Sequence, residues 1–415
     1  MKRQTGSQRK PPEFERCEML SSSIKELVEK SSVIRQMFEE GARLAAKYGA
    51  ENVYDFSLGN PNVPAPDSVN ASIKEIIDSE KSTRIHGYMN NAGFPEVREK
   101  IAGSLNKRYG TAFTQENIIM SVGAAGGLNS VLKAIIDPGD EIVVLAPFFG
   151  EYTNYASNAG AKLVVVPPNP PEFRPDPAAL SKAITKKTKA VIVNNPNNPT
   201  GVVYSEDDIK SLVAVITKKR EEYGTDIAMI SDEPYRELVY DGGDVPFLTK
   251  YYPDTFICYS YSKSLSLPGE RIGYIVIPEE MKESEEVKAA VTVATRILGF
   301  VNAPSLIQLA VAANADAEVN VAAYDKNRKA LYDGLTALGF ECVKPEGAFY
   351  LFMKSPIEDE KTFCDMAKDE NILLVPGRAF GCPGYVRIAY CVAYETIVNS
   401  MEGFGRLAAS FGLGK

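Results

Sequence analysis

Short apolar runs alternate with segments of helical spacing from Glu116 onward. Alternation of this kind is typical of right-handed β-α units, which build a mostly parallel sheet. The fold predicted from it is α/β, with a seven-stranded, mostly parallel sheet. The runs with the length and β-branched content of buried strands are 118–122, 141–147, 162–167, 189–195, 227–231, 255–262 and 274–277.

The segments before and after these strands in the sequence predict a second, smaller unit. Apolar residues over 20–47 recur at helical spacing, and 295–308 has the pattern of a long connecting helix. Beyond that helix, a further helical segment and several strand-like runs predict an α+β unit. We therefore expect a large domain over 68–304 and a smaller α+β domain formed by 19–67 and 305–415.

Composition narrows the function without fixing it. The 415 residues carry a net charge of −8, which argues against general nucleic-acid binding but not against small anionic substrates. No apolar run approaches the roughly 20 residues that span a bilayer, so we expect no membrane insertion. The single histidine, His86, excludes a histidine-based zinc site.

The chain ends and the cysteines indicate the compartment. The six cysteines show no paired spacing, and nothing resembles a secretory signal, so a reducing cytoplasm fits best. Residues 1–18 are polar and basic with few apolar positions, which predicts a flexible leader.

Candidate chemistry is concentrated in SYSKSLSLPGERIG, residues 260–273, which follows an apolar run. A partly desolvated amine at Lys263 would lose its proton readily and could condense with an aldehyde. The planar guanidinium of Arg271 suits a phosphate, with the hydroxyls of Ser260, Ser262, Ser264 and Ser266 as further donors. An aldehyde and a phosphate on one molecule describe pyridoxal phosphate (PLP).

This segment has two other interpretations. A Ser-rich loop with a lysine and an arginine is usually a solvated surface turn. Ser260-x-x-Lys263 also matches the nucleophile motif of penicillin-recognising acyl enzymes, but the companion motifs S-D-N and K-T-G are missing.

The segment 260–273 resembles the PLP-lysine signature of class I aminotransferases, which have fold type I. This resemblance covers roughly residues 20–410 and implies PLP as the cofactor, carried by Lys263. It also implies roles for Asn198 in NNPNNPTG and for Asp232 and Tyr235 in ISDEPYREL. Asn198 and Tyr235 would bind the phenolic oxygen of PLP, and Asp232 would hold the pyridine nitrogen protonated.

Further positions follow from the same resemblance. Gly123, Ala124 and Ala125 open a strand-to-helix turn whose backbone N–H groups would bind the phosphate. Phe149 would stack on the pyridine ring, and the other reading of that aromatic is core packing. The tyrosine of the 86–102 segment, Tyr88, would reach the phosphate in a partner subunit, which implies a homodimer.

Substrate contacts are implied for Gly59 and Arg387. An arginine within an apolar strand is costly to bury without an anionic partner, and Arg387 matches the family's clamp for the substrate α-carboxylate. A structural salt bridge is the alternative for Arg387. Gly59 matches a glycine near that carboxylate, and a plain turn glycine is its alternative.

The expected activity is therefore transfer of an amino group from an L-amino acid to a 2-oxo acid, with aspartate and 2-oxoglutarate as the first choice. An aspartate-type enzyme needs a second cation for the distal carboxylate, and the candidates are Arg296, Arg84 and Arg236. Two alternatives stay open: a PLP-dependent carbon–sulfur β-lyase and a PLP-binding regulator without turnover.

Overall fold

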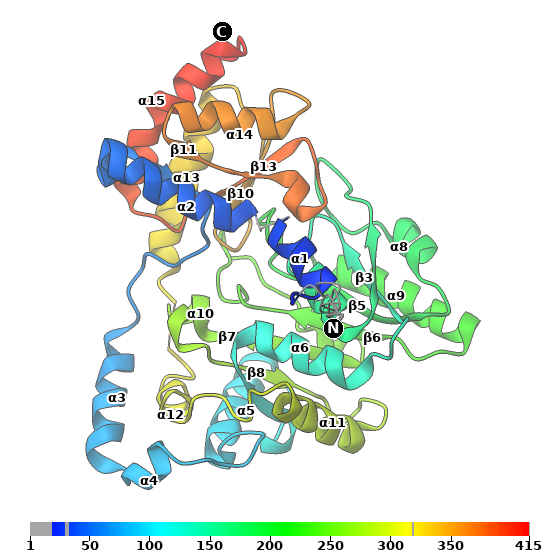
Figure 1. The fold of residues 1–415 in the computed structure, drawn as a ribbon. Coiled ribbons are helices and arrows are strands. Elements are labelled where there is room, and N and C mark those ends of the chain that lie inside the picture. Colours follow the sequence, from blue (N-terminus) through cyan, green and yellow to red (C-terminus); the bar gives the residue numbers. More distant parts are fainter. Residues whose placement is uncertain (1–18, 30–32, 318, 415) are drawn as a thin grey trace, which may run out of the picture.

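The computed structural model describes residues 19–29, 33–317 and 319–414 (Figure 1). The predicted leader over 1–18 lies outside these residues. A seven-stranded sheet forms the centre of the larger part. In spatial order its strands are β2 (Ile118–Ser121), β8 (Gly273–Val276), β7 (Thr255–Ser260), β6 (Ala228–Asp232), β5 (Thr188–Asn194), β3 (Glu141–Leu145) and β4 (Lys162–Val166).

The sheet is mostly parallel, as predicted, with one reversed strand. β3, β4, β5, β6 and β7 pair in parallel, whereas β8 is antiparallel to both β7 and β2. The carboxyl ends of six strands therefore lie at one edge, and the amino end of β8 lies there too. This reversal brings Arg271, which precedes β8, to the edge where Lys263 follows β7.

Both faces of the sheet are buried, because successive side chains of a strand point to opposite faces. In β3, Ile142 and Val144 pack on one side, while Val143 and Leu145 pack on the other. The first side is covered by α6 (Gly123–Ile135), α7 (Tyr152–Ala159) and α11 (Ser284–Ile297). The second is covered by α5 (Pro95–Tyr109), α8 (Pro177–Ala183), α9 (Glu206–Tyr223) and α12 (Ser305–Ala313).

A separate apolar core lies in the smaller part, which is drawn mostly in yellow, orange and red in Figure 1. Its antiparallel sheet has the order β12 (Val375–Pro376), β13 (Tyr385–Ala389), β10 (Tyr350–Lys354) and β9 (Cys342–Val343). β1 (Tyr54–Asp55) pairs in parallel with β11 (Ile372–Leu373). The helices of this part are α13 (Val321–Ala337), α14 (Glu360–Asp369) and α15 (Tyr394–Ser410). The domain limits expected from the sequence stay a prediction.

Five further α-helices lie within the described residues. These are α1 (Ser22–Glu29), α2 (Val33–Tyr48), α3 (Asp67–Ser79), α4 (Ser82–Ile85) and α10 (Tyr261–Ser264). No helix within the described residues is both long and apolar enough to cross a membrane. The same residues contain no cluster of His, Cys, Asp or Glu that could hold a metal ion.

The single helix predicted over 295–308 is wrong. α11 ends at Ile297 and α12 begins at Ser305, and α12 packs against α3 and α5. Between the helices, Gly299 and Val301 have positive φ values of 88° and 62°, which a right-handed helix does not allow. Pro304 also disfavours helical backbone in the residue before it. Apolar spacing alone did not reveal this break.

Gly273 has no room for a side chain, because a Cβ there would lie 2.1 Å from the Tyr259 carbonyl oxygen and 3.1 Å from the backbone of Gly123. We expect Gly273→Ala to lower the free energy of unfolding by about 1–3 kcal/mol, since β8 must move away from β7. Chemical denaturation measures this change. Gly103→Ala is the control, because a Cβ at this exposed position of α5 meets nothing within 4 Å. Equal stability of the two variants would contradict the close packing at Gly273.

Candidate active site

A cavity of about 270 Å³ opens at the carboxyl edge of the large sheet, and Tyr350 and Arg387 of the smaller part contribute to its lining. Most residues singled out from the sequence line it. They are Gly59, Ala124, Ala125, Phe149, Asn198, Asp232, Tyr235, Ser260, Lys263, Arg271 and Arg387. Lys263 and Asp232 thus face the same space, as a shared ligand between them would require.

Lys263 lies in the short helix α10, whose first turn is capped by the Ser260 hydroxyl accepting from the Ser262 N–H. Its Nζ donates to the Gly59 carbonyl at 2.6 Å. The pKa of Lys263 is lowered to about 8, chiefly by burial; Cys391 opposes this change, and the positive charges of Arg271 and Arg387 add to it. A substantial fraction of this amine is therefore neutral near pH 8.

Asp232 ends β6 and has two unequal oxygens. Its Oδ2 accepts from the Tyr152 hydroxyl at 2.5 Å and from Asn194 Nδ2 at 3.5 Å. Its Oδ1 is buried and has no hydrogen-bond partner among the described residues. The pKa of Asp232 is raised to about 7, chiefly by burial; the Tyr152 hydrogen bond opposes this rise, and Glu233 adds to it. A cationic donor at Oδ1 would stabilise the carboxylate.

Tyr235 and Tyr350 meet at the centre of the cavity, where their hydroxyl oxygens are 2.9 Å apart. Tyr350 comes from β10 of the smaller part, so this contact joins the two parts. A Cβ on Gly59 would lie 2.1 Å from the Tyr350 hydroxyl oxygen. Only glycine, which has no Cβ, lets the backbone at position 59 lie this close to the Tyr350 hydroxyl.

Arg387 in β13 is 2% exposed and has no acidic side chain within ion-pair distance among the described residues. Its Nη2 donates to the Ser57 carbonyl at 2.6 Å and its Nη1 to Asn198 Oδ1 at 3.1 Å. The guanidinium lies over the Tyr350 ring at 4.5 Å, and Nε has no partner. The salt-bridge alternative is therefore wrong, and Arg387 is left as a buried cation without a counter-ion.

The part of the cavity lined by Arg271 and the start of α6 suits an anion. Arg271 makes no ion pair among the described residues, and its Nη1 donates to the Pro268 carbonyl at 2.9 Å. α6 begins here, with Ala124 and Ala125 in the lining. Gly123, with φ of 68°, lies beside them, and a Cβ on it would be 3.5 Å from Arg271 Nη2. Backbone N–H groups at a helix start favour negative charge.

Not every hydroxyl of the 260–266 segment reaches this space. Ser260 and Ser262 line the cavity, and Ser260 donates to Ser262 Oγ at 2.8 Å. Ser264 accepts instead from the Tyr259 hydroxyl at 2.8 Å and is absent from the lining, as is Ser266. Ser264 is the last residue of α10, and Ser266 lies beyond the helix with a positive φ of 53°. Neither side chain lines the cavity, so the expectation that these two hydroxyls bind the phosphate is wrong.

Tyr88 lies away from the cavity of its own chain and is 94% exposed. The candidates for a second substrate cation also lie elsewhere. Arg84 pairs with Glu80 and Glu96, and Arg236 pairs with Glu233. Arg296 is exposed on α11. The cations that line this chain's cavity are Lys263, Arg271 and Arg387.

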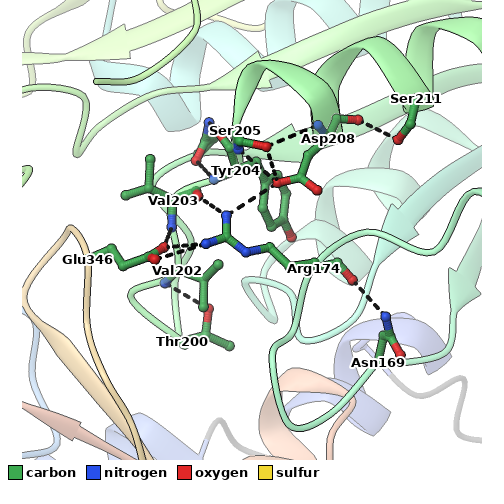
Figure 2. A network of polar contacts seen from close by, with 11 residues as sticks. Asn169, Arg174, Thr200, Val202, Val203, Tyr204, Ser205, Asp208, Ser211 and Glu346 are labelled. Atoms are coloured by element: carbon green, nitrogen blue, oxygen red, sulfur yellow. Dashed lines mark hydrogen bonds and ion pairs between the residues drawn. The ribbon is translucent and has the colours of Figure 1, made fainter. Parts of the chain in front are cut away.

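Arg174 links the segment around Val203, which follows β5, to Glu346, which precedes β10 (Figure 2). Its guanidinium donates to the Val203 carbonyl and to Asp208, and both oxygens of Glu346 accept from Nη2 at 2.9 Å. Glu346 also accepts from the Val203 N–H at 2.9 Å. The turn before β10 is thereby fixed to the loop after β5.

Several lining residues were missed from the sequence, among them Ser57, Asn194, Tyr155 and Tyr350. Tyr152, which contacts Asp232, was missed as well. Asn194 could have been predicted from the sequence, because it lies near the end of a predicted strand, where ligands bind. Tyr350 could not, since only tertiary packing brings β10 over the sheet.

Replacing Lys263 with Met removes an amine that is costly to charge. Its pKa of about 8 lies below the ordinary value of about 10.4, so the unfolded chain binds more protons between these values. Destabilisation by Lys263 is therefore complete below about pH 8 and fades as the pH rises to about 10. Without bound ligand, the free energy of unfolding at pH 7 should be about 1 kcal/mol higher for Lys263→Met than for the unmodified chain.

Urea denaturation at pH 7 and pH 10 measures this difference, with the exposed Lys100→Met as the control. A stability gain that is the same at both pH values would show that the lysine is not held in a charge-disfavouring site.

Comparison with known proteins identifies the family. The model for aminotransferase class I and II matches residues 51–402. The aspartate/prephenate aminotransferase of Thermus thermophilus is 33% identical over 85% of this chain and 90% of its own. An aminotransferase structure from Eubacterium rectale superposes with a TM-score of 0.93 at 47% identity, covering 95% of this chain and 100% of its own.

A Thermus thermophilus aspartate aminotransferase structure with maleate superposes with a TM-score of 0.84 at 29% identity, covering 94% of this chain and 100% of its own. Family model, relatives and folds agree with the lysine, carboxylate and arginine found in one cavity. This chain belongs to the class I and II aminotransferases and is a PLP-dependent transaminase.

Proposed function

We propose that this transaminase uses L-aspartate as amino donor and 2-oxoglutarate as acceptor, with the cavity at the sheet edge as its active site. The observation that carries the site assignment is the placement of the Lys263 amine and the unpartnered Asp232 Oδ1 in one lining. The names of the relatives, aspartate/prephenate and aspartate aminotransferases, support the choice of substrate.

The residues present fit PLP. Bound PLP supplies an aldehyde that captures an amine and a protonated ring that withdraws electrons from the substrate α-carbon. The buried Asp232 Oδ1 offers an acceptor for the ring N–H, and a carboxylate there keeps that nitrogen protonated. Tyr235 and Asn198 would contact the phenolic oxygen, and Phe149 would lie against the ring face.

The phosphate would bind in the part of the cavity lined by Arg271 and the start of α6. Arg271 supplies a guanidinium that forms no ion pair with a carboxylate in the described part of the chain. The hydroxyl of Ser260 and the first N–H groups of α6, at Gly123, Ala124 and Ala125, would complete the set. These groups would hold the phosphate, and Lys263 would be left to bind the aldehyde.

Arg387 would bind the substrate α-carboxylate. A carboxylate gives this buried cation the counter-ion it lacks, and its planar fork allows two parallel hydrogen bonds. Gly59 leaves space beside it. Lys263, once displaced by the substrate amine, would take the proton from the substrate α-carbon, which its lowered pKa of about 8 permits near neutral pH.

We further propose a cytoplasmic homodimer. The five described cysteines form no disulfide, which suits a reducing compartment. Tyr88 is almost fully exposed, as a residue reserved for a partner's cavity would be. A dicarboxylic substrate needs a cation beyond those that line the cavity, and the exposed Arg296 of a second copy is the candidate for it.

A panel of L-amino acids with 2-oxoglutarate tests the activity, with glutamate formation as the readout. We expect aspartate to give the highest kcat/KM, and Lys263→Ala to lose at least about 10⁵-fold in kcat, because the amine acts both as carrier and as base. Normal turnover by Lys263→Ala would refute the site. Release of pyruvate and ammonia from cysteine without glutamate formation would instead favour the β-lyase.

Mixed dimers test the role of Tyr88. Tyr88→Ala and Lys263→Ala subunits are each expected to be weak alone, but a mixed dimer would contain one intact cavity. Unfolding and refolding an equal mixture should therefore restore roughly a quarter of the activity of the unmodified enzyme, since half of the dimers are mixed. No gain above the separate variants would place Tyr88 outside the partner's site, provided that mixed dimers are confirmed by mass spectrometry.

A further inference from the structure

Tyr152 is a buried residue in contact with the proposed catalytic carboxylate. It begins α7 and is 1% exposed, and its hydroxyl donates to Asp232 Oδ2 at 2.5 Å. Its ring also meets the Phe149 ring edge to face, with centroids 5.6 Å apart. The hydroxyl and the ring therefore contact two different residues of the cavity lining.

The hydroxyl makes the two oxygens of Asp232 unequal. Oδ2 receives the short Tyr152 hydrogen bond and a long one from Asn194 at 3.5 Å. Oδ1 is buried and has no partner among the described residues. With Oδ2 anchored, rotation of the carboxyl group would break the shorter bond, so Oδ1 stays directed at the cavity.

We propose that Tyr152 is a positioning residue, which anchors one oxygen of Asp232 so that the other faces the ring nitrogen of PLP as a carboxylate. This inference rests on the role proposed above for Asp232. It goes beyond that role because it names the group that keeps Asp232 oriented and charged.

The surroundings of Asp232 make this hydrogen bond important. The titratable groups near its carboxyl are Tyr152 and Tyr155 from α7, Cys258 from β7, and Glu233 and Tyr235 on its own segment. Burial and Glu233 raise the pKa of Asp232, and the Tyr152 hydrogen bond lowers it. Burial and the nearby carboxyl also raise the pKa of Tyr152, so this hydroxyl remains the donor.

Tyr152→Phe isolates the hydroxyl, because the ring and its contact with Phe149 remain. Holoenzyme is dialysed against a series of PLP concentrations between about pH 6.5 and 9, and bound PLP is read by absorbance. Without the hydrogen bond, the pKa of Asp232 rises, so its carboxylate forms only at higher pH. We expect the Kd for PLP to increase about tenfold or more at pH 7, and this increase to shrink toward pH 9.

Tyr252→Phe is the matched control. It also removes a buried hydroxyl, one that donates to the Ile227 carbonyl at 2.6 Å at the opposite end of the sheet. We expect its Kd for PLP to be unchanged at every pH. Melting temperatures of both variants without PLP show whether the loss of a buried hydroxyl has disturbed the fold to a similar extent.

Three results would overturn the proposal: an unchanged Kd for Tyr152→Phe, an increase that is constant with pH, or an equal increase for Tyr252→Phe. Each would reduce Tyr152 to a packing role. Asp232→Asn separates this failure from failure of the site itself. If Asp232→Asn binds PLP as tightly as the unmodified enzyme, the role of Asp232 is wrong, whatever Tyr152→Phe does.

Discussion

The structure depends on burying an amine and a carboxyl group in one cavity without pairing them with each other. Burial disfavours both charges, and it moves the pKa of Lys263 down to about 8 and that of Asp232 up to about 7. Both groups are therefore near the point of changing charge at neutral pH. A cofactor with an aldehyde at one end and a basic ring nitrogen at the other would stabilise both groups.

The sheet gives these groups a common edge. Parallel strands bring Asp232, the Asn198 loop and the Lys263 helix to their carboxyl ends, where a buried ligand is expected in an open α/β sheet. The reversed strand β8 adds Arg271 from the other direction. Its close contact with β7 and the start of α6 requires Gly273, so the position of Arg271 depends on a packing constraint within the sheet.

The smaller part supplies further residues of the cavity lining. Arg387 and Tyr350 come from neighbouring strands of its sheet, and they reach Asn198 and Tyr235 of the larger part. The Arg174–Glu346 pair fixes the turn that leads into β10. Substrate carboxylate binding at Arg387 would therefore act directly on the contact between the two parts, which links recognition to the geometry at Lys263.

The sequence by itself determined the α/β class and the seven strands, because strand periodicity is local. Most of the cavity residues followed from the resemblance of the segments after these strands to the motifs of class I aminotransferases. The sequence did not reveal Tyr152 or Tyr350, the break between α11 and α12, or the turning away of Ser264 and Ser266. Those features depend on contacts between distant segments, such as Tyr152 with Asp232. Only the tertiary structure decided which side chain meets which, because close packing selects among conformations that local pattern leaves equal.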